Sequence, residues 1–255
     1  MIVREETDHF IMIEQDNHAI VSGELIKYWK KELLLSNTLM DSVVTAITLH
    51  DYGWKYFDKQ PVWNDQLKAP YDFTSYPLAP KTIIYTHGIN EVEKIDTYAA
   101  LLCSMHYTNF MTQESSPYAD SFVAQERKRQ QEIIHSMKDF DVNLFDFHYE
   151  LLKFTDSLSL FFCINKPGVK KEEFHFFYKN GIPVPFIDKG NSQIIWPEWK
   201  ADNTIYMDPF PFETELTIKI MQKKVAKDLI TKHGIVKSYE NTPCEILDLK
   251  LLSKE

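Results

Sequence analysis

The stretch NLFDFHYELLKFTDSLSLFFCI, residues 143–164, decides the fold of this chain. It is apolar almost all round, which is typical of a helix that is buried on every side. The helical period recurs before it, with apolar residues on one face and lysines opposite in 14–34, and with further helical segments in 41–50, 81–111 and 118–137. The sequence therefore predicts a mainly α fold around a central buried helix.

The two ends of the chain differ from this helical body. Residues 1–13 predict two short strands, MIVRE and HFIMI. After Asn165 come strand-like runs divided by glycine, proline, asparagine and aspartate: EFHFFY, IPVPFI, SQIIW, NTIYMD and TELTIKI. We expect a helical domain over 1–165 and a small β-rich C-terminal extension over 166–255 that packs on it.

Composition excludes several classes of function. The chain has 255 residues, 44% of them hydrophobic and 25% charged, as in an ordinary globular protein. It has seven glycines and neither GxxxxGK[ST] nor GxGxxG, which argues against a glycine-rich phosphate loop. The net charge of −9 disfavours a nucleic-acid polymer as a partner. The basic stretch QERKRQQE (125–132) is interleaved with glutamates and is best interpreted as a solvated helix face.

The sequence also predicts where the protein resides. Its first ten residues are charged and lack an apolar signal core, and no 18-residue apolar stretch occurs, so we expect no membrane partner. The three cysteines are far apart and form no CxxC, which is typical of reduced thiols. We therefore expect a soluble cytoplasmic protein. Whether it forms a homo-oligomer stays open.

The stretch TLHDYGW (48–54) raises the question of function, because His50 and Asp51 stand side by side where a predicted helix ends. Three more histidines lie on apolar helix faces or at helix ends: His18, His87 and His106. Taken alone, a histidine of this kind is more often a hydrogen-bonded core residue than a metal ligand. The pair alone is equally compatible with a polar helix end.

Asp156 is harder to explain without a ligand. It lies in the most apolar helix of the chain, between Phe154 and Leu158. A buried carboxylate is costly unless a cation pairs with it, and the neighbouring Lys153 can reach solvent. A metal cation would be an adequate partner.

The order His, His-Asp, His, His, Asp resembles that of the HD superfamily of metal-dependent phosphohydrolases. These are all-helical proteins in which a histidine, a His-Asp pair and a late aspartate bind a divalent metal. The resemblance covers about residues 10–165. It is carried by the stretches QDNHAIVSG, LHDYGW, YTHG, LCSMH and LLKFTDSLS.

The resemblance implies an HD-type helical bundle with a binuclear centre. Asp51 would bridge two divalent ions, while His18, His50 and Asp156 would complete one site. His87 and His106 are the histidines that binuclear branches of the superfamily add, and they would complete the other. Imidazole and carboxylate ligands suit Fe, Mn or Zn.

The implied activity is hydrolysis of a small phosphorylated or nucleotide-like substrate. In such enzymes a metal-bound hydroxide attacks phosphorus and the cations stabilise the developing charge. His50 and Asp51 are therefore also the candidate catalytic residues. The expected partner is a small anionic molecule, with Trp54, Lys55 and Arg127 as candidate substrate contacts.

Two alternatives stay open at this point. The same ligand set serves di-iron oxygenases of the HD type, and a non-catalytic module that senses a metabolite is the alternative from another class. The branch that cleaves cyclic dinucleotides has a lysine after HDxG and a later GYP motif. Here Trp54 takes the place of that lysine, and no GYP occurs. The aromatic, proline-punctuated segment 51–80 is either a hydrophobic flap over the core or a wall that stacks on substrate.

Overall fold

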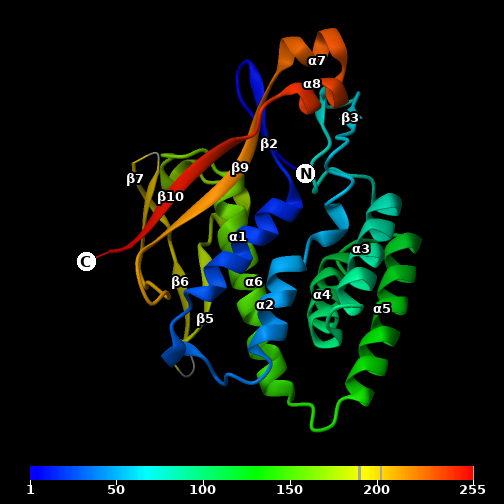
Figure 1. The fold of residues 1–255 in the computed structure, drawn as a ribbon, viewed down its shortest axis with the longest axis vertical. Coiled ribbons are helices and arrows are strands. Elements are labelled where there is room, and N and C mark those ends of the chain that lie inside the picture. Colours follow the sequence, from blue (N-terminus) through cyan, green and yellow to red (C-terminus); the bar gives the residue numbers. More distant parts are fainter. Residues whose placement is uncertain (189–190, 202, 255) are drawn as a thin grey trace.

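Helix α6 (Val142–Ile164) runs through the middle of the protein, as Figure 1 shows for this computed structural model, which describes residues 1–188, 191–201 and 203–254. Asp141 begins the helix by accepting a hydrogen bond from the Leu144 N–H at 3.1 Å. The helix is buried along most of its length, as its nearly continuous apolar sequence predicts. The prediction of a central buried helix is confirmed.

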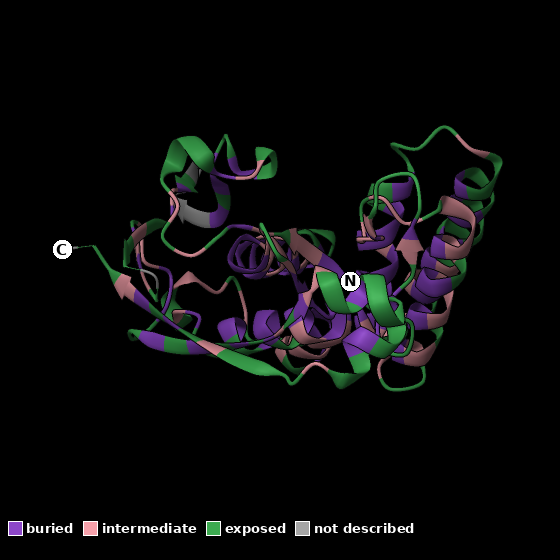
Figure 2. Cartoon of the chain, turned by 90° about the horizontal axis from the view of Figure 1, so that it is seen from above, coloured by how far each residue is buried: buried purple, intermediate pink, exposed green. Residues whose placement is uncertain are grey.

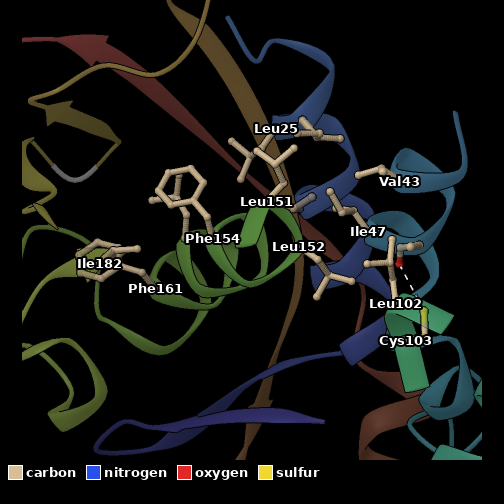
Figure 3. Packing of buried hydrophobic residues seen from close by; sticks show 14 of the residues in the cluster. Leu25, Val43, Ile47, Leu102, Cys103, Leu151, Leu152, Phe154, Phe161 and Ile182 are labelled. Atoms are coloured by element: carbon tan, nitrogen blue, oxygen red, sulfur yellow. Dashed lines mark hydrogen bonds between the residues drawn. The ribbon is translucent and has the colours of Figure 1, made fainter. Parts of the chain in front are cut away.

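Three helices pack directly on α6: α1 (Gln15–Lys27), α2 (Met40–Leu49) and α4 (Thr97–Met111). In Figure 3, Leu151 and Leu152 of α6 lie in one apolar cluster with Leu25 of α1 and Ile47 of α2. Each of these four side chains is completely shielded from solvent. This packing places α1, α2, α4 and α6 around a shared interior.

Two further helices cover the other side of α4. They are α3 (Leu78–Glu93) and α5 (Pro117–Ser136), which pack on α4 and on each other. Ser116 begins α5 as its capping residue, with Pro117 in the first helical turn, which is the usual sequence signal for a helix start. In Figure 2 the buried residues gather on the inner faces of the helices and the exposed ones on the outer faces.

A six-stranded sheet lies beside the helices, in the order β1-β2-β9-β10-β8-β7. Its strands are β1 (Ile2–Glu5), β2 (His9–Ile13), β7 (Glu198–Ala201), β8 (Thr204–Met207), β9 (Leu216–Ala226) and β10 (Glu245–Ser253). β2 pairs antiparallel with β9, and β10 pairs antiparallel with β9 but parallel with β8. Two small hairpins complete the β structure: β3 (Trp63–Asn64) with β4 (Ala69–Pro70), and β5 (Ile182–Asp188) with β6 (Asn191–Ile195).

The sheet joins the two parts that the sequence separates at residue 165. The predicted N-terminal strands are present, but they belong to the same sheet as β9, more than 200 residues later. β5 also packs on α6, and Phe161 of that helix lies in the same apolar cluster as Ile182 (Figure 3). The β-rich extension is thus continuous with the helical body.

Some element predictions are wrong. The helix expected over 14–34 ends at Lys27, and a separate 3₁₀ helix follows at Lys31–Leu33. The run EFHFFY is not a strand, because Phe176–Tyr178 is a 3₁₀ turn that buries Tyr178 against Phe161. Two short helices that the sequence did not indicate, α7 (Lys227–His233) and α8 (Ile235–Asn241), connect β9 to β10.

The fold as a whole is mainly α, with helices in about half of the chain and a curled sheet beside them. No helix in the described part of the chain combines the length and the apolar character that crossing a membrane requires.

Candidate metal centre

Five of the six predicted ligands meet in the interior that the helices share. His18 lies one turn into α1, and His50 and Asp51 follow directly on α2. His106 comes from α4 and Asp156 from α6. The packing of these four helices therefore brings together residues that are up to 138 positions apart in the chain.

The histidine rings point their Nε2 atoms at the two carboxylates. The Nε2 atom of His18 lies 3.0 Å from Oδ1 of Asp156 and 3.6 Å from Oδ2 of Asp51. For His50 the corresponding distances are 3.4 Å and 3.8 Å. The Nε2 atom of His106 lies 3.5 Å from the other Asp156 oxygen, Oδ2. Two groups of potential metal ligands result, His18 with His50 and Asp51, and His50 with His106 and Asp156.

Neighbouring polar groups fix the orientation of the first two rings. The Nδ1 atom of His50 donates to the Ile47 carbonyl at 2.8 Å, which leaves its Nε2 atom facing the cluster. The Nδ1 atom of His18 is hydrogen-bonded to the Ser159 hydroxyl, and that hydroxyl lies 2.8 Å from the Ser22 hydroxyl. Metal-binding histidines are usually held in this way through the other ring nitrogen.

Tyr107 holds the Asp51 carboxylate. Its hydroxyl lies 2.6 Å from Oδ1 of Asp51 and 2.6 Å from the His50 carbonyl oxygen, so these two acceptors share its single proton. Oδ2 of Asp51 stays directed at the histidines. The Tyr107 ring is itself fixed, because it stacks on Tyr85 of α3 with 3.8 Å between ring centroids.

Burial and charge set the protonation of the cluster in the metal-free chain. Burial alone would lower the pKa of His50, but Asp51 and Asp156 outweigh it and raise this pKa to about 9. Burial lowers the pKa of His106 to about 4, and the Asp156 carboxylate offsets only part of this effect. For Asp156 burial acts to raise the pKa, yet hydrogen bonds from His18 and His50 hold it well below its usual range. At neutral pH, His50 is therefore protonated, while His106 is neutral and Asp156 is ionised.

This donor set fits a divalent metal ion. Three imidazole Nε2 atoms face two carboxylates. Imidazole with carboxylate is the combination that Fe, Mn and Zn accept. The Nδ1 atom of His106 is buried without a hydrogen-bond partner among the described residues. A cation would also compensate the buried negative charge of Asp156, whose pKa lies well below its usual range.

A pocket of about 670 Å³ opens onto the cluster. His18, Asp51, His106 and Asp156 all line it. Much of the remaining wall is aromatic, with Phe73, Tyr85, Phe110, Phe154 and Tyr178. A mostly apolar pocket with a few convergent polar groups is typical of a small-molecule site.

The sixth predicted ligand, His87, lies elsewhere. Its side chain is 41% exposed. The Nδ1 atom of His87 lies 3.9 Å from Oε1 of Glu91 on the same helix. Tyr85 faces the pocket, and a residue two positions further along an α-helix points about 200° away from it. His87 instead lines a separate depression of about 410 Å³ between α3 and α5. The prediction of His87 as a ligand is not supported by its position, because the helical phase turns it outward.

None of the three predicted substrate contacts lines the pocket. Trp54 is 1% exposed and packs edge-on against Tyr76 and Tyr85, so it belongs to the core. The ammonium of Lys55 lies 3.9 Å from Asp16. Arg127 is exposed on the outer face of α5.

Residues that the sequence analysis did not single out line the pocket instead. Lys81 and Gln15 are buried polar residues on the pocket wall, and Phe73 is the residue of the aromatic segment 51–80 that contributes a ring. The sequence carried a signal for Lys81, since it precedes Tyr85 by four positions and shares its helix face. Within the predicted segment, one aromatic residue thus seals the core and another lines the pocket.

The fold and the site define a mainly helical protein with an internal His/Asp cluster. The chain belongs to the DUF3891 family, described as a protein of unknown function, whose sequence pattern matches residues 1–227. The match includes all five residues of the cluster and crosses residue 165, where the sequence changes character. No curated protein and no solved structure matches the chain.

Proposed function

We propose that this protein is a metal-dependent hydrolase of a small phosphorylated or nucleotide-like substrate, and that its helices form an HD-type bundle. The observation that carries the proposal is the convergence of His18, His50, Asp51 and Asp156 in one cluster, and all of these except His50 line the pocket. Their order in the sequence is the ligand order of the HD superfamily. They come from α1, the end of α2 and α6. The chemistry of the set and its position at a small-molecule pocket support the same conclusion.

In this proposal the four side chains hold one divalent ion, with His106 beside it against Oδ2 of Asp156. A second ion, as in a binuclear centre, would have to bind through His106 without His87. A resident divalent cation would supply Lewis acidity, polarising a phosphoryl oxygen and lowering the pKa of water.

The chain itself orients and encloses the reacting groups. Tyr107 and the Ile47 carbonyl hold Asp51 and His50 in position, so little reorganisation is needed on binding. The aromatic walls, among them Phe110 and Tyr178, would shield one side of a bound substrate from water. Exclusion of water strengthens every electrostatic contact with a developing phosphoryl charge.

The test is turnover of a panel of phosphomonoesters, phosphodiesters and nucleotides by the full chain, after removal of metal and reconstitution with Mn²⁺, Zn²⁺ or Fe²⁺. We expect metal-dependent release of phosphate or of a nucleotide product. Asp51→Asn should lower kcat/KM by at least about 100-fold. His87→Ala is the matched control, because it removes a histidine that lies outside the cluster, and it should leave kcat/KM unchanged.

The same experiment separates the hydrolase from the two alternatives. An oxygenase would need iron, would consume oxygen and would not turn over phosphoesters. A metabolite sensor would bind a ligand without any turnover. Absence of phosphoester turnover with all three metals, in protein that has taken up metal, would overturn the hydrolase proposal.

A further inference from the structure

Lys81 is an unusual lysine because it is buried in the wall of the pocket. It lies in the first turns of α3 and is 7% exposed. It shares the pocket wall with His18, Asp51 and Asp156. A lysine is almost never buried to this extent without a partner, because its ammonium then loses hydration.

No partner for Lys81 is found among the described residues. Its ammonium makes no hydrogen bond or ion pair there, and Glu114 and Asp72 act on it only as more distant charges. Burial lowers its pKa from the usual value, and those two carboxylates offset only part of this effect. The other lysine of the pocket, Lys153, differs, since it forms an ion pair with Glu150 at 2.6 Å. Lys81 alone therefore keeps its donors available to the pocket.

Gln15 is a second polar side chain on the same wall without a partner. It is 4% exposed, and its amide oxygen Oε1 is buried and accepts no hydrogen bond from the described residues. Its backbone is held in place, because Asp58 accepts a hydrogen bond from the Gln15 N–H at 2.7 Å. The pocket wall thus offers an ammonium on a largely buried lysine and a buried amide oxygen, and neither has a hydrogen-bond partner among the described residues.

Lys81 is connected to the His/Asp cluster through α3 and two stacked rings. Tyr85 lies one turn after Lys81, about 6 Å along the helix axis, and lines the same pocket. Tyr85 stacks on Tyr107, whose hydroxyl binds Asp51. Lys81 and the cluster therefore line one pocket from different elements, so a molecule that contacts both must present a polar group to each.

We infer that Lys81 anchors a second anionic group of the substrate, a phosphate or a carboxylate, apart from the group that reacts at the His/Asp cluster. Gln15 accepts a hydrogen bond from a hydroxyl or amine of the same molecule. The substrate class is then a small compound with two anionic ends. This inference rests on the proposed function only for the identity of the reacting group, since the anion site is built from residues outside the cluster.

The test is calorimetric titration of the full chain, stripped of metal with a chelator, with inorganic phosphate and separately with succinate at low salt and pH 7. Removing the metal prevents the anions from binding to it. Wild type, Lys81→Met and Lys153→Met are compared. Methionine keeps the length of the lysine side chain and removes its charge, and Lys153 is the matched control because it lines the same pocket but is already paired.

We expect wild type to bind one equivalent of at least one of the two anions, and the preferred anion identifies the group. Lys81→Met should weaken this binding about tenfold or more, while Lys153→Met should change it less than about twofold. Without anion, Lys81→Met should melt at the same temperature as wild type or higher, because an unpaired buried charge is removed.

Three results would overturn the inference. The first is that wild type binds neither anion. The second is that Lys81→Met binds the anion as tightly as wild type does. The third is that Lys81→Met melts well below wild type in anion-free buffer, which would make the lysine structural. A failure of the hydrolase proposal remains distinguishable, because it appears in turnover with metal and leaves this metal-free titration unaffected.

Discussion

Gly53 offers the sharpest perturbation of the site, although it binds nothing itself. It lies in the 3₁₀ helix Tyr52–Trp54 that follows Asp51, and this helix packs on α3. A Cβ added to Gly53 would lie 2.2 Å from the carbonyl oxygen of Ile84 and 3.2 Å from the backbone nitrogen of Gly88. Both atoms belong to the backbone of α3, so no side-chain rotation can relieve the contact.

The size of the expected effect follows from these distances. Cβ atoms are essentially never closer than 3.0 Å to such an atom, so Gly53→Ala must open the contact by at least 3.0 − 2.2 = 0.8 Å. Metal–ligand distances tolerate only about 0.2 Å. Asp51 lies two residues away on the same segment, so we expect the Kd for metal to rise about 10–100-fold. Overpacking of this kind lowers the free energy of unfolding by about 1–3 kcal/mol.

The assay is calorimetric titration of metal-free protein with Mn²⁺, together with thermal melting. Gly234→Ala is the control, since Gly234 has φ +78° and an added Cβ there meets nothing within 4 Å. Its ψ of 162° lies in a region that essentially only glycine adopts, so that variant should lose about 1–3 kcal/mol of stability through backbone strain and bind metal as wild type does. If Gly53→Ala binds Mn²⁺ with wild-type affinity, or if Gly234→Ala weakens binding equally, the contact with α3 does not position the site.

Three further predictions test other parts of the structure. Tyr107→Phe keeps the stack on Tyr85 but removes the hydrogen bond to Asp51, and the Kd for Mn²⁺ measured by calorimetry should rise about 10–100-fold; an unchanged Kd would show that Asp51 needs no support. Metal binding must displace the proton that His50 carries, because the pKa of its imidazole is about 9. The Kd for Mn²⁺ should therefore rise about tenfold for each unit by which the pH falls from 9 to 6. A Kd that stays constant over this pH range would contradict the prediction. A fragment of residues 1–165 lacks β9, the partner of β2, and should be unfolded or aggregated by circular dichroism and gel filtration; a monomeric, cooperatively folding fragment would restore the two-domain division.

The fold could be predicted where the signal was local. The apolar stretch 143–164 predicted the central helix α6, and the helical period predicted most of the helices around it. The pairing of β2 with β9 could not be predicted, because strand periodicity is local and contains no information about a partner more than 200 residues away. The same limit explains why the boundary at residue 165 does not divide the sheet.

The ligands could be predicted where the helical period placed them on a buried helix face. His18, His106 and Asp156 lie on buried faces of their helices, as their apolar neighbours indicated. His87 fails on the same criterion, since α3 buries Ile84, Tyr85, Gly88, Ile89 and Val92 and turns the histidine outward. Lys81 was missed because a lysine near a helix start is usually solvated, and only tertiary packing buries it.

The most direct test of the metal centre is elemental analysis by mass spectrometry of protein purified without chelators. Wild type, Asp51→Ala and His87→Ala are compared, with folding of each checked by circular dichroism. We predict close to one equivalent of Fe, Mn or Zn in wild type and in His87→Ala, and very little in Asp51→Ala. Wild type that carries and takes up no metal, or folded Asp51→Ala that keeps full occupancy, would contradict the assignment of the cluster as a metal site.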